Sequence, residues 1–304
     1  MRLFCAAVAI LWSLQTGADL PKGAATSVAP LRDSGWIAAW GGEVVVLEGG
    51  APAARATVPG FERITALAMA PDGRRAALAG GVPGRFGSAA LYDVGERRVV
   101  TICESVQFKD VATCAGFTAD GSKLLVGSAD GTAALIDART HKKLHELRGH
   151  TGPILACAVK DGILVTGSAD RTLRVWSESG ELLRTLTQHS GAVNALTFEP
   201  GGRRLVSAAD DRTVRLWDPF VGRMIRSFRG FPGGATALLW PLPEELLVGA
   251  TDGRLRRIAL PDGVLTDVEA PRESGWIYGV AVRPGSSKGA VALAGTHGVT
   301  AAPR

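Results

Sequence analysis

Aromatic residues are scarce in this sequence and make up only 6% of its 304 positions. Alanine, glycine and valine occupy the places where larger side chains could pack, which is expected of many short strands that approach one another closely. Hydrophobic residues still account for 46% of the chain and charged residues for 21%, enough for a globular core and incompatible with a disordered chain. Beyond its N-terminal stretch, the sequence has no apolar run long enough to span a membrane.

Motifs of several enzyme classes are also missing. The chain has no glycine-rich phosphate loop after a strand, no Gly-x-Ser-x-Gly elbow and no His-Glu-x-x-His pair. Its five histidines show no spacing typical of metal ligands, and His297 has no second ligand in sight. We therefore predict no catalytic residue, no metal site and no cofactor, and a protein that is not an enzyme.

Cysteine is rare as well, with four residues and no Cys-x-x-Cys-His motif, which excludes covalent attachment of a c-type haem to this chain. Cys5 lies in the N-terminal stretch, so Cys103, Cys114 and Cys157 are left for the folded part. Because three is an odd number, at least one of them stays unpaired within the chain. Cys114 and Cys157 fall in β-like runs and are interpreted as small buried residues.

The N-terminus has the three parts of a secretory signal peptide: a basic start (residues 1–2), an apolar run (3–14) and a small-residue triplet (16–18). We expect cleavage after Ala18, and hence a periplasmic or secreted mature protein. The alternative is an uncleaved anchor, but the run is well short of the roughly 20 residues that a spanning helix needs.

The middle of the chain repeats itself, since LVTGSADRTLRVW (164–176) and LVSAADDRTVRLW (205–217) nearly superimpose at a period of 41 residues. Counted from Trp176 and Trp217, the same slot recurs every 40 to 45 residues at Leu47, Tyr92, Ile136, Ile258 and Pro303. Within each unit, β runs alternate with turns rich in Gly and Asp. A period of this length predicts an all-β, seven-bladed β-propeller with four-stranded antiparallel blades.

These units resemble WD40 repeats, because Gly149-His150 with Trp176, and His189 with Trp217-Asp218, match that family's Gly-His and Trp-Asp landmarks. The resemblance, to a bacterial exported type, implies a hydrogen-bonded chain of His, Ser or Thr, turn Asp and Trp inside a blade. Carried over here, the two sets are His150, Ser168, Asp170 and Trp176, and His189, Ser207, Asp211 and Trp217. We interpret both sets as structural, because buried polar groups must be paired.

The expected domains are a signal peptide (1–18) and one propeller (19–304), with blades at about 24–59, 60–104, 105–149, 150–190, 191–231, 232–273 and 274–304. Blades three and six keep the turn residues Asp130 and Asp252 but carry isoleucine in the Trp slot. The last blade has at most three strands of its own. By resemblance, residues 19–29 are expected to supply its missing outer strand.

A recognition surface is predicted at the channel mouth, where the resemblance places the second position of each innermost strand and the residue before each turn Asp. The mapped positions are Thr65, Thr113, Leu155, Asn194, Thr236 and Tyr278, with Ala129, Ala169, Asp210 and Thr251. Tyr278 and the adjacent Trp276 are the large anchors. The enlarged connection 80–89 adds Arg85 and Phe86, unless it is only a tolerated insertion. The candidate partner-binding residues are thus Tyr278, Trp276, Asn194, Asp210, Thr236, Leu155, Arg85 and Phe86.

We therefore predict a monomeric, non-enzymatic scaffold outside the cytoplasm that presents a rigid propeller face to a protein or peptide. The alternative is an accessory or assembly factor of a periplasmic c-type cytochrome electron-transfer system. Nucleic acid is not expected, because the charge is dispersed and no aromatic stacking motif is present. Basic doublets at turns of the opposite face suggest a second, cationic surface, or only solvated hairpin tips: Arg74-Arg75, Arg97-Arg98, Lys142-Lys143 and Arg203-Arg204.

Overall fold

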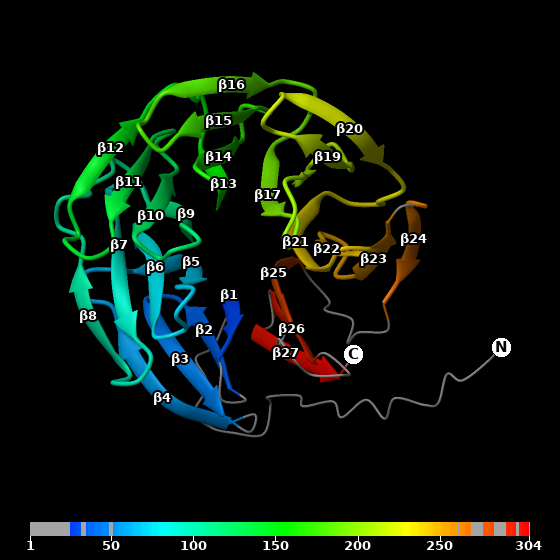
Figure 1. Cartoon of the computed structure of the whole chain (residues 1–304). Helices are drawn as coiled ribbons and strands as arrows, with labels where there is room; N and C mark the ends of the chain where they lie inside the picture. Colours follow the sequence, from blue (N-terminus) through cyan, green and yellow to red (C-terminus); the bar gives the residue numbers. More distant parts are fainter. Residues whose placement is uncertain are drawn as a thin grey trace.

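Consecutive strands form small antiparallel sheets that stand side by side in a ring (Figure 1). The structure, a computed structural model, describes residues 25–31, 35–48, 51–260, 262–268, 276–282, 290–295 and 298–303. In each sheet the strands pair in chain order, and the first strand lies nearest the centre of the ring. The predicted signal peptide lies outside the described residues.

Six of the sheets are four-stranded blades. The first contains β1 (Ala25–Pro30), β2 (Trp36–Trp40), β3 (Glu43–Glu48) and β4 (Ala51–Thr57), and the second β5 (Arg63–Met69), β6 (Arg75–Val82), β7 (Phe86–Asp93) and β8 (Arg98–Ile102). The third contains β9 (Ala112–Phe117), β10 (Lys123–Ser128), β11 (Ala133–Asp137) and β12 (Lys143–Leu147), and the fourth β13 (Ile154–Lys160), β14 (Ile163–Ser168), β15 (Leu173–Ser177) and β16 (Leu182–Leu186). The fifth contains β17 (Val193–Phe198), β18 (Leu205–Ala209), β19 (Val214–Asp218) and β20 (Arg223–Phe228), and the sixth β21 (Ala235–Leu242), β22 (Glu245–Ala250), β23 (Leu255–Ala259) and β24 (Val264–Asp267).

The prediction of seven four-stranded blades is wrong. The described residues form six such blades and a last sheet of three strands, β25 (Ile277–Val282), β26 (Ala290–Gly295) and β27 (Gly298–Pro303). The segment expected to complete the last sheet is used elsewhere, because residues 25–30 form β1, the innermost strand of the first blade, which pairs with β2. Residues 19–24 lie outside the described part.

Apolar contact joins the first blade to the last sheet. Val28 and Trp40 share one buried cluster with Ala281 and Ala294. The two ends of the ring therefore meet through side-chain contact, and not through exchange of an outer strand with β1.

How apolar a strand is depends on its position within the blade. The second strand of a blade is covered by a neighbouring blade on each face, so β14 is apolar or small along its whole length and buried at every position. The outermost strand has only one protected edge, and β16 is exposed at four of its five positions. Continuous apolar runs thus mark the middle strands, as expected for strands buried on both faces.

Neighbouring blades interlock through a small residue in one blade and a branched residue in the next. The facing pairs are Gly127 with Ile154, Gly167 with Val193, and Gly249 with Ile277. A Cβ atom at Gly167 would lie only 2.7 Å from Cγ1 of Val193, so the glycine is required by close approach. In the fifth blade the slot holds Ala208, and the next blade presents the smaller Ala235 in the same cluster.

No helix in the described part of the chain has the length and apolar character needed to cross a membrane.

Candidate functional site

The innermost strands enclose a central cavity of about 510 Å³. Strands of all six blades and of the last sheet contribute side chains to its wall, most of them small or weakly polar. At one rim, where the inner strands begin, Arg63, Asp210 and Trp276 line the cavity. All three are exposed, and the Trp276 side chain keeps 51% of its accessible surface.

Side chains of the inner strands tie each blade to the next around this cavity. Thr26 Oγ1 donates to Ile64 O (2.7 Å), Thr65 Oγ1 to Ala112 O, Thr113 Oγ1 to Ile154 O (2.5 Å), Asn194 Nδ2 to Ala235 O (3.1 Å) and Thr236 Oγ1 to Ile277 O (2.5 Å). Four of these donors are positions that sequence reasoning placed at the channel mouth for a partner. The structure gives them a structural role, which their recurrence as Thr or Asn at the period of the blades could have suggested.

Leu155 interrupts this ring of ties. It occupies the corresponding position of β13 and lines the cavity half-buried, but its side chain cannot donate a hydrogen bond. The matching carbonyl in the next blade is that of Val193, so the interface between the fourth and fifth blades has no side-chain tie of this kind. There the interlock of Gly167 with Val193 carries the contact.

Asp210 connects the ring of ties to the rim. Its Oδ1 accepts from Nδ2 of Asn194 at 2.7 Å, and the same amide nitrogen donates to Ala235 O in the sixth blade. Tyr278, the other predicted anchor, lies in β25, and its side chain falls outside the described part. Of the two large predicted anchors, the structure therefore places the side chain of Trp276 at the rim.

The enlarged connection of the second blade is a rigid extension of β6 and β7. Gly87 and Phe108 exchange backbone hydrogen bonds (3.2 and 2.9 Å), and Gly84 N donates to Oδ1 of Asp110 at 2.7 Å, so the hairpin is fastened to the third blade. Phe86 is half-buried with its ring edge-on to that of another phenylalanine, at a centroid separation of 6.3 Å. Arg85 at the tip of this hairpin is exposed, so a partner could reach its side chain.

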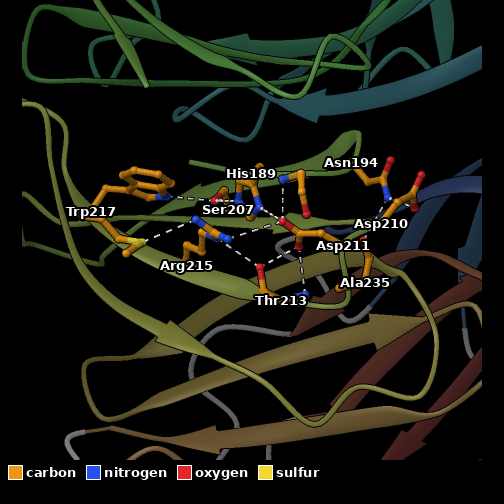
Figure 2. A network of polar contacts seen from close by, with 11 residues as sticks. His189, Asn194, Ser207, Asp210, Asp211, Thr213, Arg215, Trp217 and Ala235 are labelled. Carbon is orange, nitrogen blue, oxygen red and sulfur yellow. Dashed lines mark hydrogen bonds and ion pairs between the residues drawn. The ribbon is translucent and has the colours of Figure 1, made fainter. Parts of the chain in front are cut away.

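A chain of hydrogen bonds crosses the interior of the fifth blade (Figure 2). Nδ1 of His189 lies 2.7 Å from Oδ2 of Asp211, and its Nε2 lies 2.7 Å from Oγ of Ser207. Nε1 of Trp217 donates to the same hydroxyl at 2.8 Å. The carboxylate of Asp211 also accepts from the amide of Ser190 and from Thr213.

The fourth blade contains the equivalent chain, with one residue different from the prediction. His150 lies 2.7 Å from Asp170 and 2.9 Å from Oγ1 of Thr166, to which Trp176 Nε1 donates at 2.9 Å. The hydroxyl between His and Trp is therefore that of Thr166, and the assignment of Ser168 is wrong. Ser168 Oγ instead donates to a backbone carbonyl at 3.0 Å and accepts from the amide of Asp170, as part of the turn.

Burial and the hydrogen bonds of these chains fit the structural role expected from the sequence. Burial lowers the pKa of His150 and His189, and hydrogen bonds with the aspartates only partly offset this. Burial alone would raise the pKa of Asp170, but the hydrogen bonds that its carboxylate accepts lower it to about 2. Since an ionised carboxylate only accepts, Nδ1 of each neutral imidazole carries the proton, and Nε2 accepts from the hydroxyl. With both imidazoles fully buried, neither nitrogen can reach a substrate.

Two other blades replace this polar chain by an apolar set. In the slots of His, hydroxyl and Trp, the third blade has Phe108, Val126 and Ile136, and the sixth has Phe231, Val248 and Ile258. Each set is buried within one cluster. Sequence reasoning noted only the isoleucines. Because all three slots change together, we expect the polar members to depend on one another.

Carboxylates neutralise much of the predicted cationic surface. Arg97 pairs with Glu48 (2.5 Å), Arg98 with Glu96 (2.6 Å), Lys143 with Glu146 (3.4 Å), Arg75 with Asp72 (3.8 Å), and Arg204 with Glu199. Arg203 lies over the ring of Phe220, 4.0 Å from its centroid. These doublets do not form a uniformly cationic face. Within the described ranges, no three His, Cys, Asp or Glu side chains gather as metal ligands.

Comparison with known families finds a match for the middle of the chain. The family model of the WD domain, G-beta repeat, matches residues 141–177 and 180–218. Two segments of this chain are therefore similar to the WD40 repeat. Each begins with the outermost strand of one blade, β12 or β16, and ends with the third strand of the next, β15 or β19. The repeat therefore joins neighbouring blades covalently.

Several similar curated proteins are fungal nuclear distribution proteins. They include the nuclear distribution protein nudF of Aspergillus niger (28% identical over 149 residues, 41% of this chain and 34% of that protein) and nudF 2 of Penicillium rubens (32% over 145 residues, 40% and 31%). Another is nudF 2 of Aspergillus clavatus (43% over 79 residues, 25% and 18%). The matches span about a third or less of these relatives. They give no support to a bacterial exported type or to the electron-transfer alternative.

Proposed function

We propose that this chain is a non-enzymatic scaffold that receives a protein or peptide segment at the rim of its central cavity. The observation that carries the proposal is the exposed indole of Trp276 beside a cavity of about 510 Å³. Large aromatic side chains at the edge of a depression are the residues on which interfaces most often depend. The WD40 repeats support a role in protein binding.

The charges at the rim favour a peptide over a polyanion. Arg63 and Asp210 lie on the second and fifth blades and give the cavity one charge of each sign. Among the described residues that line the cavity, Arg63 is the one cation, whereas nucleic acids need several. An extended segment with an apolar anchor and polar ends fits this arrangement.

The location stays a prediction. Residues 1–18 have the composition of a signal peptide, and the proposed scaffold would then act outside the cytoplasm. N-terminal sequencing of the mature protein checks this directly, and an intact Met1 would contradict it.

Site-specific photocrosslinking in the native host tests the binding proposal. A benzophenone amino acid replaces Trp276 in one variant and Val221 in the control, since Val221 is 67% exposed on a turn of the fifth blade far from the inner strands. We expect a discrete adduct at position 276 that is absent at 221 and weakened by Asp210→Ala. Identical adducts at both positions, or none at 276 in a variant with a wild-type melting curve, would refute the proposal.

A further inference from the structure

Cys114 and Cys157 come from neighbouring blades and meet at one interface. Cys114 is buried in β9 of the third blade, in a cluster that also contains Leu164 and Trp176 of the fourth, and Cys157 of β13 packs against this cluster. Both residues also line the central cavity, which is the side from which a solute would approach the pair.

The strand geometry directs the two sulfur atoms toward each other. Residues two apart in a strand face the same side, so Cys114 and Gly116 share one face of β9. A Cβ atom at Gly116 would lie 4.0 Å from Sγ of Cys157, which places the thiol of Cys157 opposite that face. The Cys157 thiol donates to Leu125 O (4.0 Å), and the neighbouring Cys114 thiol together with burial raises the pKa of Cys157 well above the usual range.

Glycines lie beside both sulfur atoms. Gly127 faces Cys114 across the ladder, and Sγ of Cys114 already fills part of the space of its missing side chain, 2.7 Å from where a Cβ atom would be. Gly116 leaves more room beside Cys157, because a Cβ atom there would lie 4.0 Å from Sγ of Cys157. A disulfide needs a sulfur separation of about 2.0 Å, so oxidation requires the two sulfur atoms to move together.

We propose that Cys114 and Cys157 are a dithiol site that a small disulfide such as oxidised glutathione converts into a covalent bridge between the third and fourth blades. The thiolate of Cys157, the more exposed partner, attacks the oxidant, forms a mixed disulfide and expels one glutathione thiolate. Cys114, as its thiolate, then attacks the Cys157 sulfur and expels the second. The protein loses two hydrogens, and one oxidised glutathione becomes two reduced molecules.

This pairing leaves Cys103 as the odd cysteine of the folded part. Its side chain is buried in a separate cluster with Val106 and Phe108, and burial raises its pKa to about 11. Because Cys103 neither lines the central cavity nor shares a cluster with another cysteine, it serves as an internal control.

Thiol counting on the full chain tests the proposal. Reduced protein is incubated with oxidised glutathione at mildly alkaline pH, unfolded with a maleimide of high mass, and compared on a gel with untreated protein. We expect wild type and Cys103→Ser to lose two reactive thiols each, and Cys114→Ser and Cys157→Ser to show no bridge. Non-reducing peptide mapping of wild type, which needs no variant, should show residue 114 joined to 157. The bridge should raise the melting temperature by about 5 °C.

Several results would overturn the proposal. They are a full set of thiols after oxidation, a stable adduct of one glutathione without a bridge, a disulfide that includes Cys103, or a disulfide between two chains. The oxidation rate should rise with pH beyond the range of ordinary cysteines, because the thiolate is the attacking species.

Discussion

Replacing one hydroxyl of the fifth blade should destabilise the whole protein. Ser207 Oγ is the shared partner of His189 Nε2 and Trp217 Nε1, and all three side chains are buried. Ser207→Ala leaves both nitrogens without that partner. Each unsatisfied buried group costs about 1 to 3 kcal/mol, so we expect the free energy of unfolding to fall by about 2 to 6 kcal/mol.

The apolar set of the third and sixth blades provides the decisive comparison. His189→Phe, Ser207→Val and Trp217→Ile together remove every group that would be left unpaired, and the larger Phe and Val offset the volume lost with the indole. Asp211 keeps the amide of Ser190 as a donor, together with its bonds from Thr213. We therefore expect the triple variant to be more stable than Ser207→Ala alone, although it carries three changes.

Urea unfolding followed by far-ultraviolet circular dichroism measures both effects without relying on Trp217 fluorescence. The matched control is Ser179→Ala, an exposed serine that also makes a side-chain hydrogen bond, and it should stay within about 0.5 kcal/mol of wild type. A wild-type midpoint for Ser207→Ala, or a triple variant no more stable than Ser207→Ala, would refute the idea that these residues depend on one another.

Three further predictions concern the same architecture. Gly167→Ala should lower stability by about 1 to 3 kcal/mol because its Cβ would meet Val193, and adding Val193→Ala should recover part of the loss in urea unfolding; additive losses would contradict the interlock. Thr113→Val should cost about 0.5 to 1.5 kcal/mol in thermal unfolding through loss of one tie, whereas Thr113→Ser, which keeps the hydroxyl, should cost less. Burial lowers the pKa of His150 and His189 in the folded protein, so these histidines take up protons first in the unfolded chain. The free energy of unfolding should therefore be highest above the ordinary histidine pKa of 6.5 and fall as the pH drops below it. Melting temperatures that do not change between about pH 7 and pH 5 would exclude this linkage.

The period of the sequence predicted the strands of the blades well, because each middle strand must be apolar on both faces. The strand that pairs with the first strand, β1, could not be predicted from this pattern. Alternation along residues 25–30 shows which side is buried but not which strand pairs with it. Only residues 31–35 separate β1 from β2, so their pairing closes a short loop, whereas pairing with the last sheet would close a loop as long as the chain.

The hydroxyl of the fourth blade shows a second limit of sequence reasoning. Thr166 and Ser168 are two apart, so both point to the same face of β14 and both can bond. The register decides between them, because Leu164 pairs with Trp176 and thereby brings Thr166 next to the indole. Counting 41 residues back from Ser207, the repeat period of the chain, would have selected Thr166.

Asp210 lies at the rim where we propose that a partner binds, and it also supports the contact between two blades. The polar residues of the channel wall are largely committed to ties between blades, which leaves a partner chiefly the rim. At the rim, the carboxylate of Asp210 orients the Asn194 amide that bonds the sixth blade. A cationic group of a partner that binds Oδ1 of Asp210 would compete with the hydrogen bond from Asn194. A cationic group that binds Oδ2 would not. If a partner binds at this rim as proposed, we expect its binding to be coupled to the contact between the fifth and sixth blades through the Asp210 side chain.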